Sequence, residues 1–381
     1  MHMEDVTIVG GGPVGLLLAL RLASRGVRAS VIERREEPHG GSRSIGIHPP
    51  ALEKLDELGL GARFVDEGVR VRRGLAFAGV EPLGTIDFGS CLGKHRYVLT
   101  IEQQKTEAIL REALEARSPG SLRTGLEAVA LERSSRSVRI KVRDAKGREH
   151  TEESAFVIGC DGKRSRCRET SAIPFNGDRY PGGYLMGDAP DTTSLGDEAA
   201  VYLHAEGLVE SFPLPNRMRR WVIRRNEEGT ASADELSDVV RERTGHRISP
   251  HDVVRASAFR AERFVAERFA VGRVALAGDA AHVISPIGGQ GMNLGWLGAC
   301  SLADALAEAA KRGAPTPALE ADGRRRSRMA RAAARRAELN MWLGRPTPRA
   351  LRAELVRVLL SRPLVTALAR AFTMRGLEWG V

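Results

Sequence analysis

VTIVGGGPVG, residues 6–15, is the stretch of sequence that decides the fold. The β-branched run before the glycines predicts a short buried strand, and the apolar spacing of residues 16–24 predicts a helix directly after them. Gly10 permits a tight turn, Gly12 lets a ligand approach the backbone, and Gly15 lets the helix pack closely on the strand. The strand, turn and helix together predict a dinucleotide site.

Two further features support a nucleotide at this turn. Pro13 and Val14 open the helix, where free backbone amides attract the negative charge of a pyrophosphate. A second strand, residues 28–32, ends at Glu33, whose carboxylate can accept hydrogen bonds from an adenosine ribose. Glu33 therefore indicates a ribose without a 2′-phosphate. The alternative is a glycine-rich turn that binds no ligand.

Two later segments extend this predicted site. Asp161-Gly162 follows an apolar strand over 155–158, although Asp-Gly alone is typical of a simple turn. Residues 273–277 indicate a buried strand that delivers Asp279 to its carboxyl end, where ligands bind in open α/β sheets. Asp279 is then placed to bind the hydroxyls of a ribityl chain.

PIGGQGMN, residues 286–293, predicts a loop that precedes an apolar helix. Gly289 and Gly291 let the backbone approach a flat ring. The backbone amides of Met292 and Asn293 can hold the O2/N1 edge of a flavin, because the positive end of the helix dipole stabilises the anionic reduced ring. The three separated segments together predict one site for FAD.

In this order, the segments resemble the three fingerprints of the para-hydroxybenzoate hydroxylase family, the single-component FAD-dependent aromatic monooxygenases. The last fingerprint, Gly278-Asp279 through Asn293, is nearly as the family writes it. The family usually continues toward an Asp a few residues later, where this chain has Gly295-Trp296-Leu297-Gly298. By this resemblance, three further residues contact the adenosine and diphosphate parts of FAD: Arg34, Arg43 and Gln103.

The resemblance implies an NAD(P)H-consuming monooxygenase. In the family, reduced FAD combines with O2 to give a C4a-hydroperoxide, whose distal oxygen attacks an electron-rich ring or, in some members, a double bond. The protein must exclude water from this adduct. Only one dinucleotide fingerprint is present, so NADPH or NADH is expected to bind transiently at the surface while the flavin ring moves to meet it.

The expected fold class is α/β, with a Rossmann-like FAD-binding domain interleaved with a β-sheet substrate domain and followed by C-terminal helices. The FAD-binding domain is expected over 1–69, 98–170 and 262–310, the substrate domain over 70–97 and 171–261, and the helical region over 311–381. Within the substrate domain, we expect a hairpin over 71–88, strands over 199–203 and 220–224, and a helix over 234–243. These two insertions should form one sheet that covers the flavin ring.

No residue is required to act as a covalent catalyst. Pro286 is the positional candidate for catalysis, because its carbonyl would lie beside the flavin and accept a hydrogen bond from a substrate hydroxyl; the alternative is a proline that only stiffens the loop. His282 is interpreted as structural. Four side chains are candidates for lining the substrate pocket, although strand aromatics more often pack in the core: His48, Tyr184, Tyr202 and Trp221. Three arginines are candidates for clamping a substrate carboxylate: Arg217, Arg219 and Arg220.

The covering segment has few aromatic and many small residues, which is compatible with a wide apolar cavity. We therefore expect a lipophilic phenol, quinone or quinolone as the substrate, together with O2. The alternatives are an isoprenoid reductase of the same fold, a flavin-dependent halogenase and a non-catalytic flavin-binding sensor. The halogenase class carries a Trp-x-Trp-x-Ile-Pro segment and a lysine that have no counterpart here.

Composition sets further limits. The chain has 381 residues, of which 42% are hydrophobic, so it can bury a sizeable core. Its four cysteines show no metal-ligand spacing, so we expect no metal site and reduced thiols in a cytoplasmic protein. No apolar run reaches the roughly 18 residues that a membrane span needs.

The net charge of +10 is concentrated at the C-terminal end. Residues 324–381 contain fourteen Arg, no Lys and three acids, while the preceding residues are near neutrality. This region has few aromatics, so no nucleic-acid partner is expected. A solvated helical face is the favoured interpretation, and peripheral contact with a membrane surface or an acidic partner is the alternative. Four apolar residues at helical spacing predict a stripe that packs on the protein itself: Leu351, Leu355, Val358 and Leu359. The oligomeric state is left open.

Overall fold

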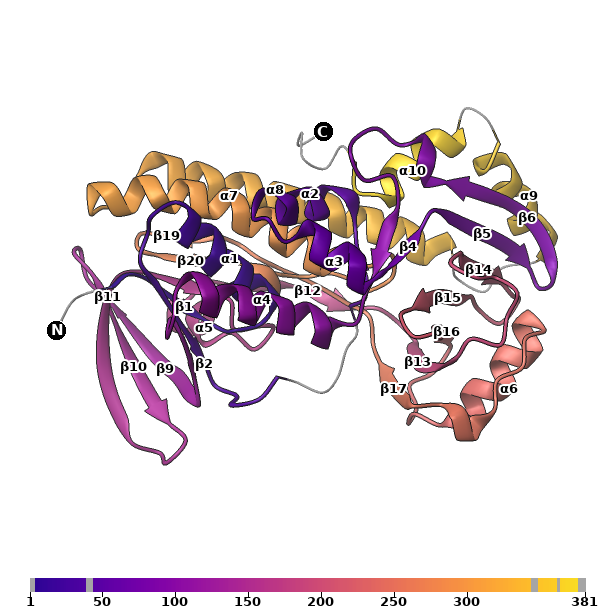
Figure 1. Cartoon of the computed structure of the whole chain (residues 1–381), viewed down its shortest axis with the longest axis horizontal. Helices are drawn as coiled ribbons and strands as arrows, with labels where there is room; N and C mark the ends of the chain where they lie inside the picture. Colours follow the sequence, from indigo (N-terminus) through magenta and orange to yellow (C-terminus); the bar gives the residue numbers. More distant parts are fainter. Residues whose placement is uncertain (1–3, 39–43, 344–348, 362–363, 376–381) are drawn as a thin grey trace.

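The computed structural model describes residues 4–38, 44–343, 349–361 and 364–375. A mainly parallel sheet forms one half of the molecule (Figure 1), with the strand order β19-β20-β11-β1-β2-β8 and a β9–β10 hairpin that extends from β11. The strands are β1 (Glu4–Val9), β2 (Ala29–Glu33), β8 (Leu122–Thr124), β9 (Leu126–Arg133), β10 (Val138–Asp144), β11 (Glu149–Gly159), β19 (Ala270–Val271) and β20 (Val274–Leu276).

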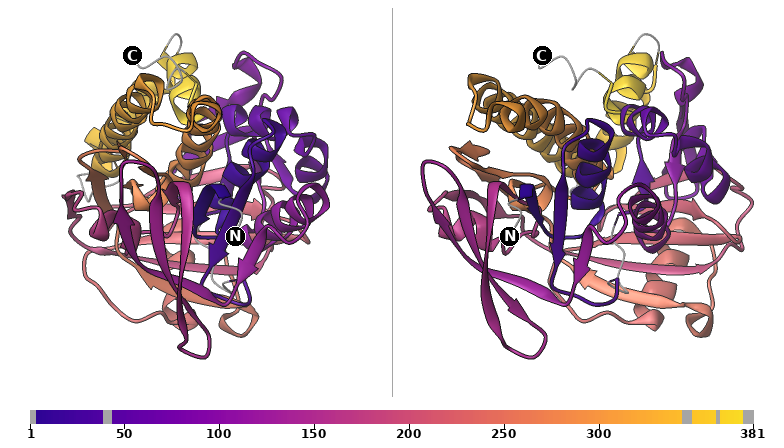
Figure 2. Two further views of the ribbon diagram at one scale, coloured as in Figure 1. Left: turned by 90° about the vertical axis from the view of Figure 1, so that its left-hand side faces the viewer. Right: turned by 60° about the vertical axis from the view of Figure 1, so that its left-hand side comes forward.

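This sheet is buried on both faces, as is usual for parallel strands between helical layers. Val6 and Ile8 of β1 pack in one apolar cluster with α1 (Pro13–Ser24), α4 (Gln103–Arg117) and α7 (Gln290–Arg312). Val9 belongs to a second cluster, which includes β10 and α8 (Pro317–Leu343). Figure 2 shows the two long helices α7 and α8 lying side by side above the strands.

The departure from the family pattern after Asn293 is a packing feature of α7. A Cβ on Gly295 would lie 2.6 Å from Cγ2 of Val14, so α7 can approach the start of α1 closely. The next residue, Trp296, is fully buried, and its Nε1 donates a hydrogen bond to the carbonyl of Pro13 at 2.9 Å. These residues therefore fix the first glycine turn against α7.

The two predicted insertions form one seven-stranded sheet in the order β17-β13-β16-β15-β14-β5-β6. The first insertion supplies the predicted hairpin, and α6 (Ala233–Thr244) matches the predicted helix. The strands are β5 (Arg73–Ala78), β6 (Glu81–Asp87), β13 (Gly183–Pro190), β14 (Ala199–Leu203), β15 (Val209–Leu214), β16 (Met218–Arg225) and β17 (Arg255–Phe259).

One strand of the second insertion differs from the expectation. β12 (Phe175–Arg179) pairs with β18 (Glu262–Ala266) and β21 (His282–Val283) in a separate three-stranded sheet. Pro181 ends the run, and Gly182 has a φ of +80°, a conformation that favours glycine. The chain therefore turns before β13 begins.

Smaller elements complete the fold. A further three-stranded sheet has the order β3 (Gly46–Ile47), β7 (Val98–Thr100) and β4 (Val69–Val71). The short helices are α2 (Pro49–Glu57), α3 (Gly61–Glu67) and α5 (Arg166–Thr170), with single 3-10 turns at Phe88–Ser90, Pro250–Asp252 and Gly278–Ala280.

The C-terminal helices α9 (Arg349–Leu359) and α10 (Leu364–Phe372) pack on β6, where Figure 1 shows them in yellow. The predicted apolar stripe of α9 is only partly buried: Leu359 faces inward, whereas Leu355 and Val358 are 39% and 54% exposed. The side chain of Leu351 lies outside the described residues. A short helix that packs on the edge of a sheet buries only one narrow side, which explains why part of the predicted stripe is exposed.

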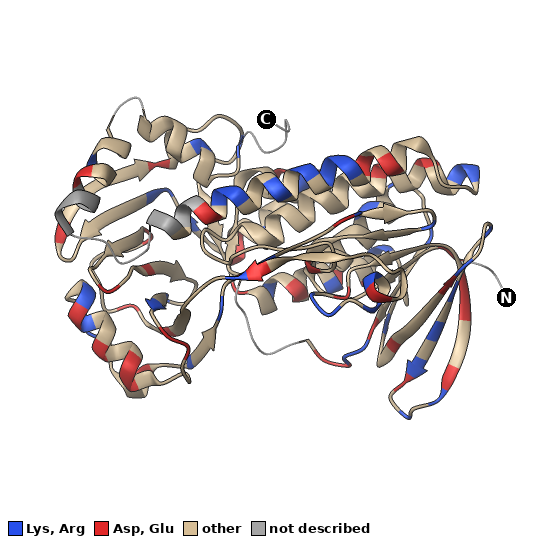
Figure 3. Ribbon diagram, turned by 180° about the vertical axis from the view of Figure 1, so that it is seen from behind, with Lys and Arg blue, Asp and Glu red and all other residues tan. Residues whose placement is uncertain are grey.

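The arginines of α8 follow a mixed pattern. Most of those described are exposed, whereas Arg326 is buried and pairs with Asp322 at 2.6 Å. Figure 3 shows Lys and Arg positions as blue bands along the long helices. All four cysteines are free thiols. Within the described residues, no helix is long and apolar enough to cross a membrane.

Candidate active site

The first glycine turn leaves a space beside the start of α1. A Cβ on Gly10 would lie 2.3 Å from the carbonyl oxygen of Cys160, and a Cβ on Gly15 would lie 2.0 Å from that of Gly10. A Cβ on Gly12 would meet no heavy atom of the other described residues within 4 Å, its two chain neighbours apart. Gly10 and Gly15 are therefore required for close packing, whereas Gly12 faces open space in front of α1. The first turn of α1 carries no acidic residue, and no side chain caps it.

Glu33 lies at the end of β2 against this turn. Its carboxylate accepts hydrogen bonds from the backbone N–H of Gly11 at 2.7 Å and from the backbone N–H and Nε of Arg35, both at 3.0 Å. Burial raises the pKa of this carboxyl, but the hydrogen bonds from Arg35 and Gly11 outweigh it and hold the pKa below its usual value. Glu33 therefore stays ionised and fixed at the edge of the site.

Two of the three residues expected from the resemblance, Arg34 and Gln103, are among the described residues. Arg34 is exposed, and its guanidinium lies 3.7 Å from the carboxylate of Glu127. Gln103 is the first residue of α4 and donates from Nε2 to Glu107 at 2.8 Å. Arg43 lies outside the described residues.

The Asp161-Gly162 turn follows β11, the neighbour of β1. Oδ1 of Asp161 accepts from the hydroxyl of Ser165 at 2.6 Å, and Oδ2 accepts from the backbone N–H of Cys167 at 3.1 Å. Burial raises the pKa of Asp161. Arg168 donates to the carbonyl of Ala280 at 3.1 Å, so this turn is tied directly to the third segment.

The third segment surrounds the start of α7. Asp279 follows β20 and is exposed at the carboxyl end of the strand. Gly288 and Gly289 have φ angles of +84° and +64°, and a Cβ on Gly291 would meet no heavy atom within 4 Å in the part of the chain that the structure describes, its two chain neighbours apart. No described side chain caps α7, and its first turn has no acidic residue. The backbone amides at the start of this helix, among them that of Met292, therefore face the loop.

Asn293 holds this loop to the segment before α2. Its side chain is fully buried; Oδ1 accepts from the backbone N–H of His48 at 2.8 Å, and Nδ2 donates to the carbonyls of Gly46 and Gly289, both at 2.8 Å. The side-chain amide of Asn293 is thereby used for positioning, and its backbone N–H is the group available to a cofactor.

These features fit FAD. β1, β2, β11 and β20 are parallel neighbours, so the three turns meet at one edge of the sheet, where ligands bind in α/β folds. Two uncapped helix starts offer amides for anions, and open space lies in front of Gly12 and Gly291. Within the described residues, no group of three or more metal-binding side chains occurs.

A cavity of about 240 Å³ lies between the Pro286–Gly289 loop and the seven-stranded sheet. Apolar residues dominate its lining, and the C-terminal region contributes Val356 and Leu359 of α9, Leu360 directly after it, and Leu368 and Phe372 of α10. The charged or polar side chains in the lining are His48, Thr100, Glu210 and Arg220.

The structure separates the aromatic candidates for the substrate pocket. Tyr202 and Trp221 pack under α6 on the far face of the sheet, and the Tyr202 hydroxyl lies 2.8 Å from Nε2 of His246. Adjacent strand residues point to opposite faces, which explains why neither lines the cavity. Tyr184 is on the cavity side, in a cluster with Met186 and Ile287, and stacks on Phe259.

His48 and Pro286 both line the cavity. His48 Nε2 donates to the carbonyl of Gly288 at 3.0 Å, and burial lowers the pKa of this histidine to about 4, so the ring is neutral at pH 7. The carbonyl of Pro286 accepts from the backbone N–H of Gly289 at 2.9 Å. A carbonyl oxygen has two lone pairs, so this bond leaves one for a substrate hydroxyl.

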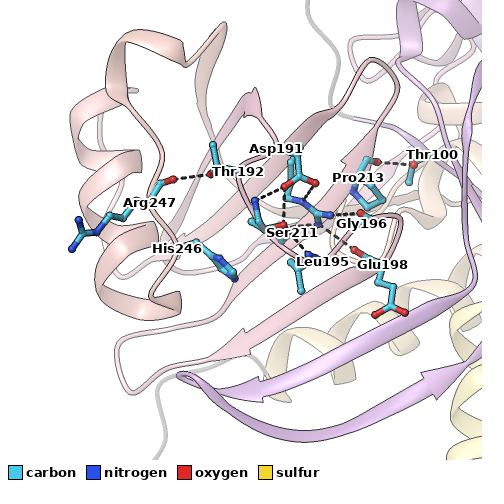
Figure 4. A network of polar contacts seen from close by, with 12 residues as sticks. Thr100, Asp191, Thr192, Leu195, Gly196, Glu198, Ser211, Pro213, His246 and Arg247 are labelled. Carbon is cyan, nitrogen blue, oxygen red and sulfur yellow. Dashed lines mark hydrogen bonds and ion pairs between the residues drawn. The ribbon is translucent and has the colours of Figure 1, made fainter.

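The three arginines do not form a joint clamp for a carboxylate. Arg217 is exposed in a turn, and Arg220 reaches the cavity but pairs with Asp188 through Nε at 2.6 Å and Nη2 at 2.7 Å. Arg219 is fully buried on the other face, where Figure 4 shows its partners: it donates to Asp191, Ser211 and the carbonyls of Gly196 and Glu198.

His282 is buried, stacks on Phe269, and has its pKa lowered to about 4 by burial, with the charge of Arg326 adding to the effect. Its placement agrees with a structural role. Because the unfolded chain binds a proton at His282 near pH 6.5 and the folded chain does not, stability is lost as the pH falls from 6.5 toward 4, by about 3 kcal/mol at most.

His282→Gln should flatten this pH dependence. The free energy of unfolding in urea is measured for the flavin-loaded wild type and the flavin-loaded variant at pH 7 and at pH 4.5. The carboxylates titrate equally in both proteins, so the difference between the two losses reports on His282. An equal loss of stability in the two proteins would contradict the interpretation.

Sequence reasoning missed two parts of the cavity wall. Glu210 is a single acid in the apolar strand VESFPL, a break in pattern that could have drawn attention. The residues of α9 and α10 showed only helical periodicity, which does not reveal what a helix packs against.

The comparisons with known proteins agree with this geometry. Residues 3–337 match the FAD binding domain family. The chain is 34% identical over 372 residues to a rifampicin monooxygenase from Streptomyces venezuelae, covering 93% of this chain and 75% of that protein. It is 32% identical to pentachlorophenol 4-monooxygenase from Sphingobium chlorophenolicum, covering 78% of this chain but 57% of that protein.

A comparison with solved structures also finds a flavin-dependent hydroxylase fold. The anhydrotetracycline hydroxylase OxyS from Streptomyces rimosus superimposes with a TM-score of 0.81 at 33% identity, over 98% of this chain and 76% of that one. The family match spans most of the chain, and the three turns that fit FAD lie within it. The chain therefore belongs to the family of FAD-dependent aromatic monooxygenases.

Proposed function

We propose that this protein inserts one oxygen atom from O2 into a lipophilic phenol, quinone or quinolone bound in the cavity. The cavity between the Pro286–Gly289 loop and the seven-stranded sheet is the observation that carries the proposal. Its apolar lining favours a lipophilic guest and excludes water, which a monooxygenase requires. The names of the relatives, which act on rifampicin, pentachlorophenol and anhydrotetracycline, support an aromatic substrate.

In this proposal, FAD supplies the activation of O2, and NADPH or NADH supplies the electrons through a transient contact. The residues proposed to contact FAD are Gly10, Gly12, Pro13, Val14, Gly15, Glu33, Arg34, Arg43, Gln103, Asp161, Asp279, Gly289, Gly291, Met292 and Asn293, on segments within 1–69, 98–170 and 262–310. His48, Tyr184 and the Pro286 carbonyl are proposed to lie on the substrate side. Tyr202 and Trp221 are not included, because they lie on the far face of the sheet.

Oxygen uptake with NADPH, measured against a panel of phenols and quinolones, tests the proposal. A substrate should accelerate both NADPH oxidation and O2 uptake, and label from ¹⁸O2 should appear in the product. Reduction of an unsaturated compound without O2 uptake would favour the reductase alternative. Failure of every compound to change either rate, in protein that holds FAD, would favour the sensor.

A contact with an anionic membrane surface is a second, independent proposal, in an otherwise cytoplasmic protein. Five exposed arginines of α8 support it, and exposed apolar residues on α9 and α10 add to the support: Arg324, Arg325, Arg328, Arg331 and Arg335, with Leu355, Val358 and Leu364. Co-sedimentation with vesicles of anionic lipid at low salt, released at high salt, is expected. Equal sedimentation with neutral vesicles would contradict the electrostatic contact.

A further inference from the structure

Glu210 occupies the middle of the cavity wall. It lies on β15, the fourth strand of the seven-stranded sheet, and is paired with Val222 of β16 on one side and Val201 of β14 on the other. Val222 is paired in turn with Met186 of β13. All four residues line the cavity, so the Glu210 carboxyl stands in a transverse row of apolar side chains.

The polar side chains that share the cavity wall are already engaged. Thr100 donates to the carbonyl of Pro213 at 2.7 Å, Arg220 pairs with Asp188, and His48 donates to Gly288. Glu210 is 8% exposed and has no hydrogen bond or ion pair to any residue in the described ranges. A buried carboxyl without a partner is costly, so its presence calls for a partner that the described residues do not supply.

A second unpartnered group lies on the same face. The hydroxyl of Tyr184 is buried and makes no hydrogen bond within the described residues. Its pKa is raised by burial and further by the negative charge of Glu210, which places the two groups within electrostatic reach of each other. Within the described residues, the Tyr184 hydroxyl is therefore an unused donor and the Glu210 carboxylate an unused acceptor on the same face of the sheet.

We propose that the Glu210 carboxyl binds the ring hydroxyl of the substrate and accepts its proton. This inference rests on the proposed function and narrows it to substrates with a free phenolic hydroxyl. In the transfer, the phenol O–H bond breaks, an O–H bond forms on Glu210, and the electron pair stays on the phenolate oxygen, which enriches the ring for attack. The proton returns to this oxygen when the oxygenated ring regains its hydroxyl.

The titration of Glu210 suits an acidic phenol. Burial raises the pKa of Glu210 to about 7, which lies between a usual glutamate and the phenol of tyrosine near 10. The other charged or titratable groups that face it are Tyr184 from β13, Arg220 and Arg224 from β16, and His48 at the start of α2. The substrate class is therefore phenols whose own pKa is lowered by electron-withdrawing ring substituents, since a proton is shared best between groups of similar pKa.

Two probes separate the hydroxyl contact from general apolar binding. Oxidised, FAD-loaded protein is titrated with 4-nitrophenol and with nitrobenzene, which lacks the hydroxyl, without NADPH and at pH values from 6 to 8.5. The wild type should bind 4-nitrophenol about 10- to 100-fold more tightly, the range expected for a hydrogen bond to a charged group. The bound probe should show the phenolate absorption, with a transition near the pKa of Glu210.

Glu210→Gln should lose this preference, keep its affinity for nitrobenzene and bind 4-nitrophenol as the neutral phenol. Glu210→Asp should restore part of the phenolate signal, which a purely structural role would not predict. Glu227→Gln is the matched control, because Glu227 is exposed in the loop after β16 and should behave as wild type.

A wild-type protein without preference for the hydroxyl, or a Glu210→Gln variant that retains the preference and the phenolate signal, would overturn the inference. Because these titrations need no turnover, they are independent of the oxygen-uptake assay. Loss of uptake with an intact phenolate signal would reject the proposed function and leave the Glu210 contact standing.

Discussion

Gly12→Ala is expected to abolish tight FAD binding while the chain without flavin remains folded. The backbone of Gly12 has a φ of −78° and a ψ of −179°, which alanine adopts without strain, and apart from its chain neighbours no heavy atom of the described residues lies within 4 Å of the added Cβ. That space is where a pyrophosphate would approach the start of α1. We expect affinity for FAD to fall by about 100-fold or more, which corresponds to about 3 kcal/mol. Fluorescence titration of the flavin-free protein with FAD measures the change.

Gly15→Ala is the matched comparison. Its Cβ would lie 2.0 Å from the carbonyl oxygen of Gly10, so this variant should lose both stability and FAD. In contrast, the unfolding free energy of flavin-free Gly12→Ala should stay within about 1 kcal/mol of wild type. Unchanged FAD affinity in Gly12→Ala would show that the pyrophosphate does not lie at this turn.

Asn293→Ala should destabilise the protein and loosen its hold on the flavin. The substitution removes two buried hydrogen bonds and one partly buried hydrogen bond, and leaves the N–H of His48 and the carbonyls of Gly46 and Gly289 without this partner. Unsatisfied buried groups cost about 1–3 kcal/mol each, so we expect a loss of about 2–5 kcal/mol in the free energy of unfolding. Chemical denaturation of the flavin-free variant measures the loss, and FAD titration shows whether the loop still binds.

Asn176→Ala serves as the control for this variant. Asn176 is exposed on β12, so its removal should change the free energy of unfolding by no more than about 0.5 kcal/mol. Asn293→Ala with wild-type stability and wild-type affinity for FAD would contradict the role assigned to its side chain.

The parts of the fold that sequence predicted are those set by local chemistry. Gly15 is required by a contact within the first turn, with the carbonyl of Gly10, and the strands before Asp161 and Asp279 follow from short apolar runs. The strands over 199–203 and 220–224 followed from their alternating pattern. Such signals lie within about ten residues of one another, so they can be read without knowing the tertiary structure.

The parts that sequence could not settle depend on which face of a strand meets the cavity. Tyr184 and Tyr202 carry the same side chain in similar strands, yet they lie on opposite faces of one sheet. The contribution of Leu360 and Phe372 to the cavity wall depends on where the C-terminal helices dock, which their own periodicity does not specify. The unpartnered state of Glu210 among the described residues became visible only when its surroundings could be examined in the structure.

The most direct test of the account is the stoichiometry of flavin in the purified protein, followed by its response to NADPH and a phenol in air. We predict one FAD per chain from the visible absorption spectrum, with NADPH oxidation and O2 uptake that rise together when a phenolic substrate is added. A colourless protein that does not bind added FAD would contradict the central claim.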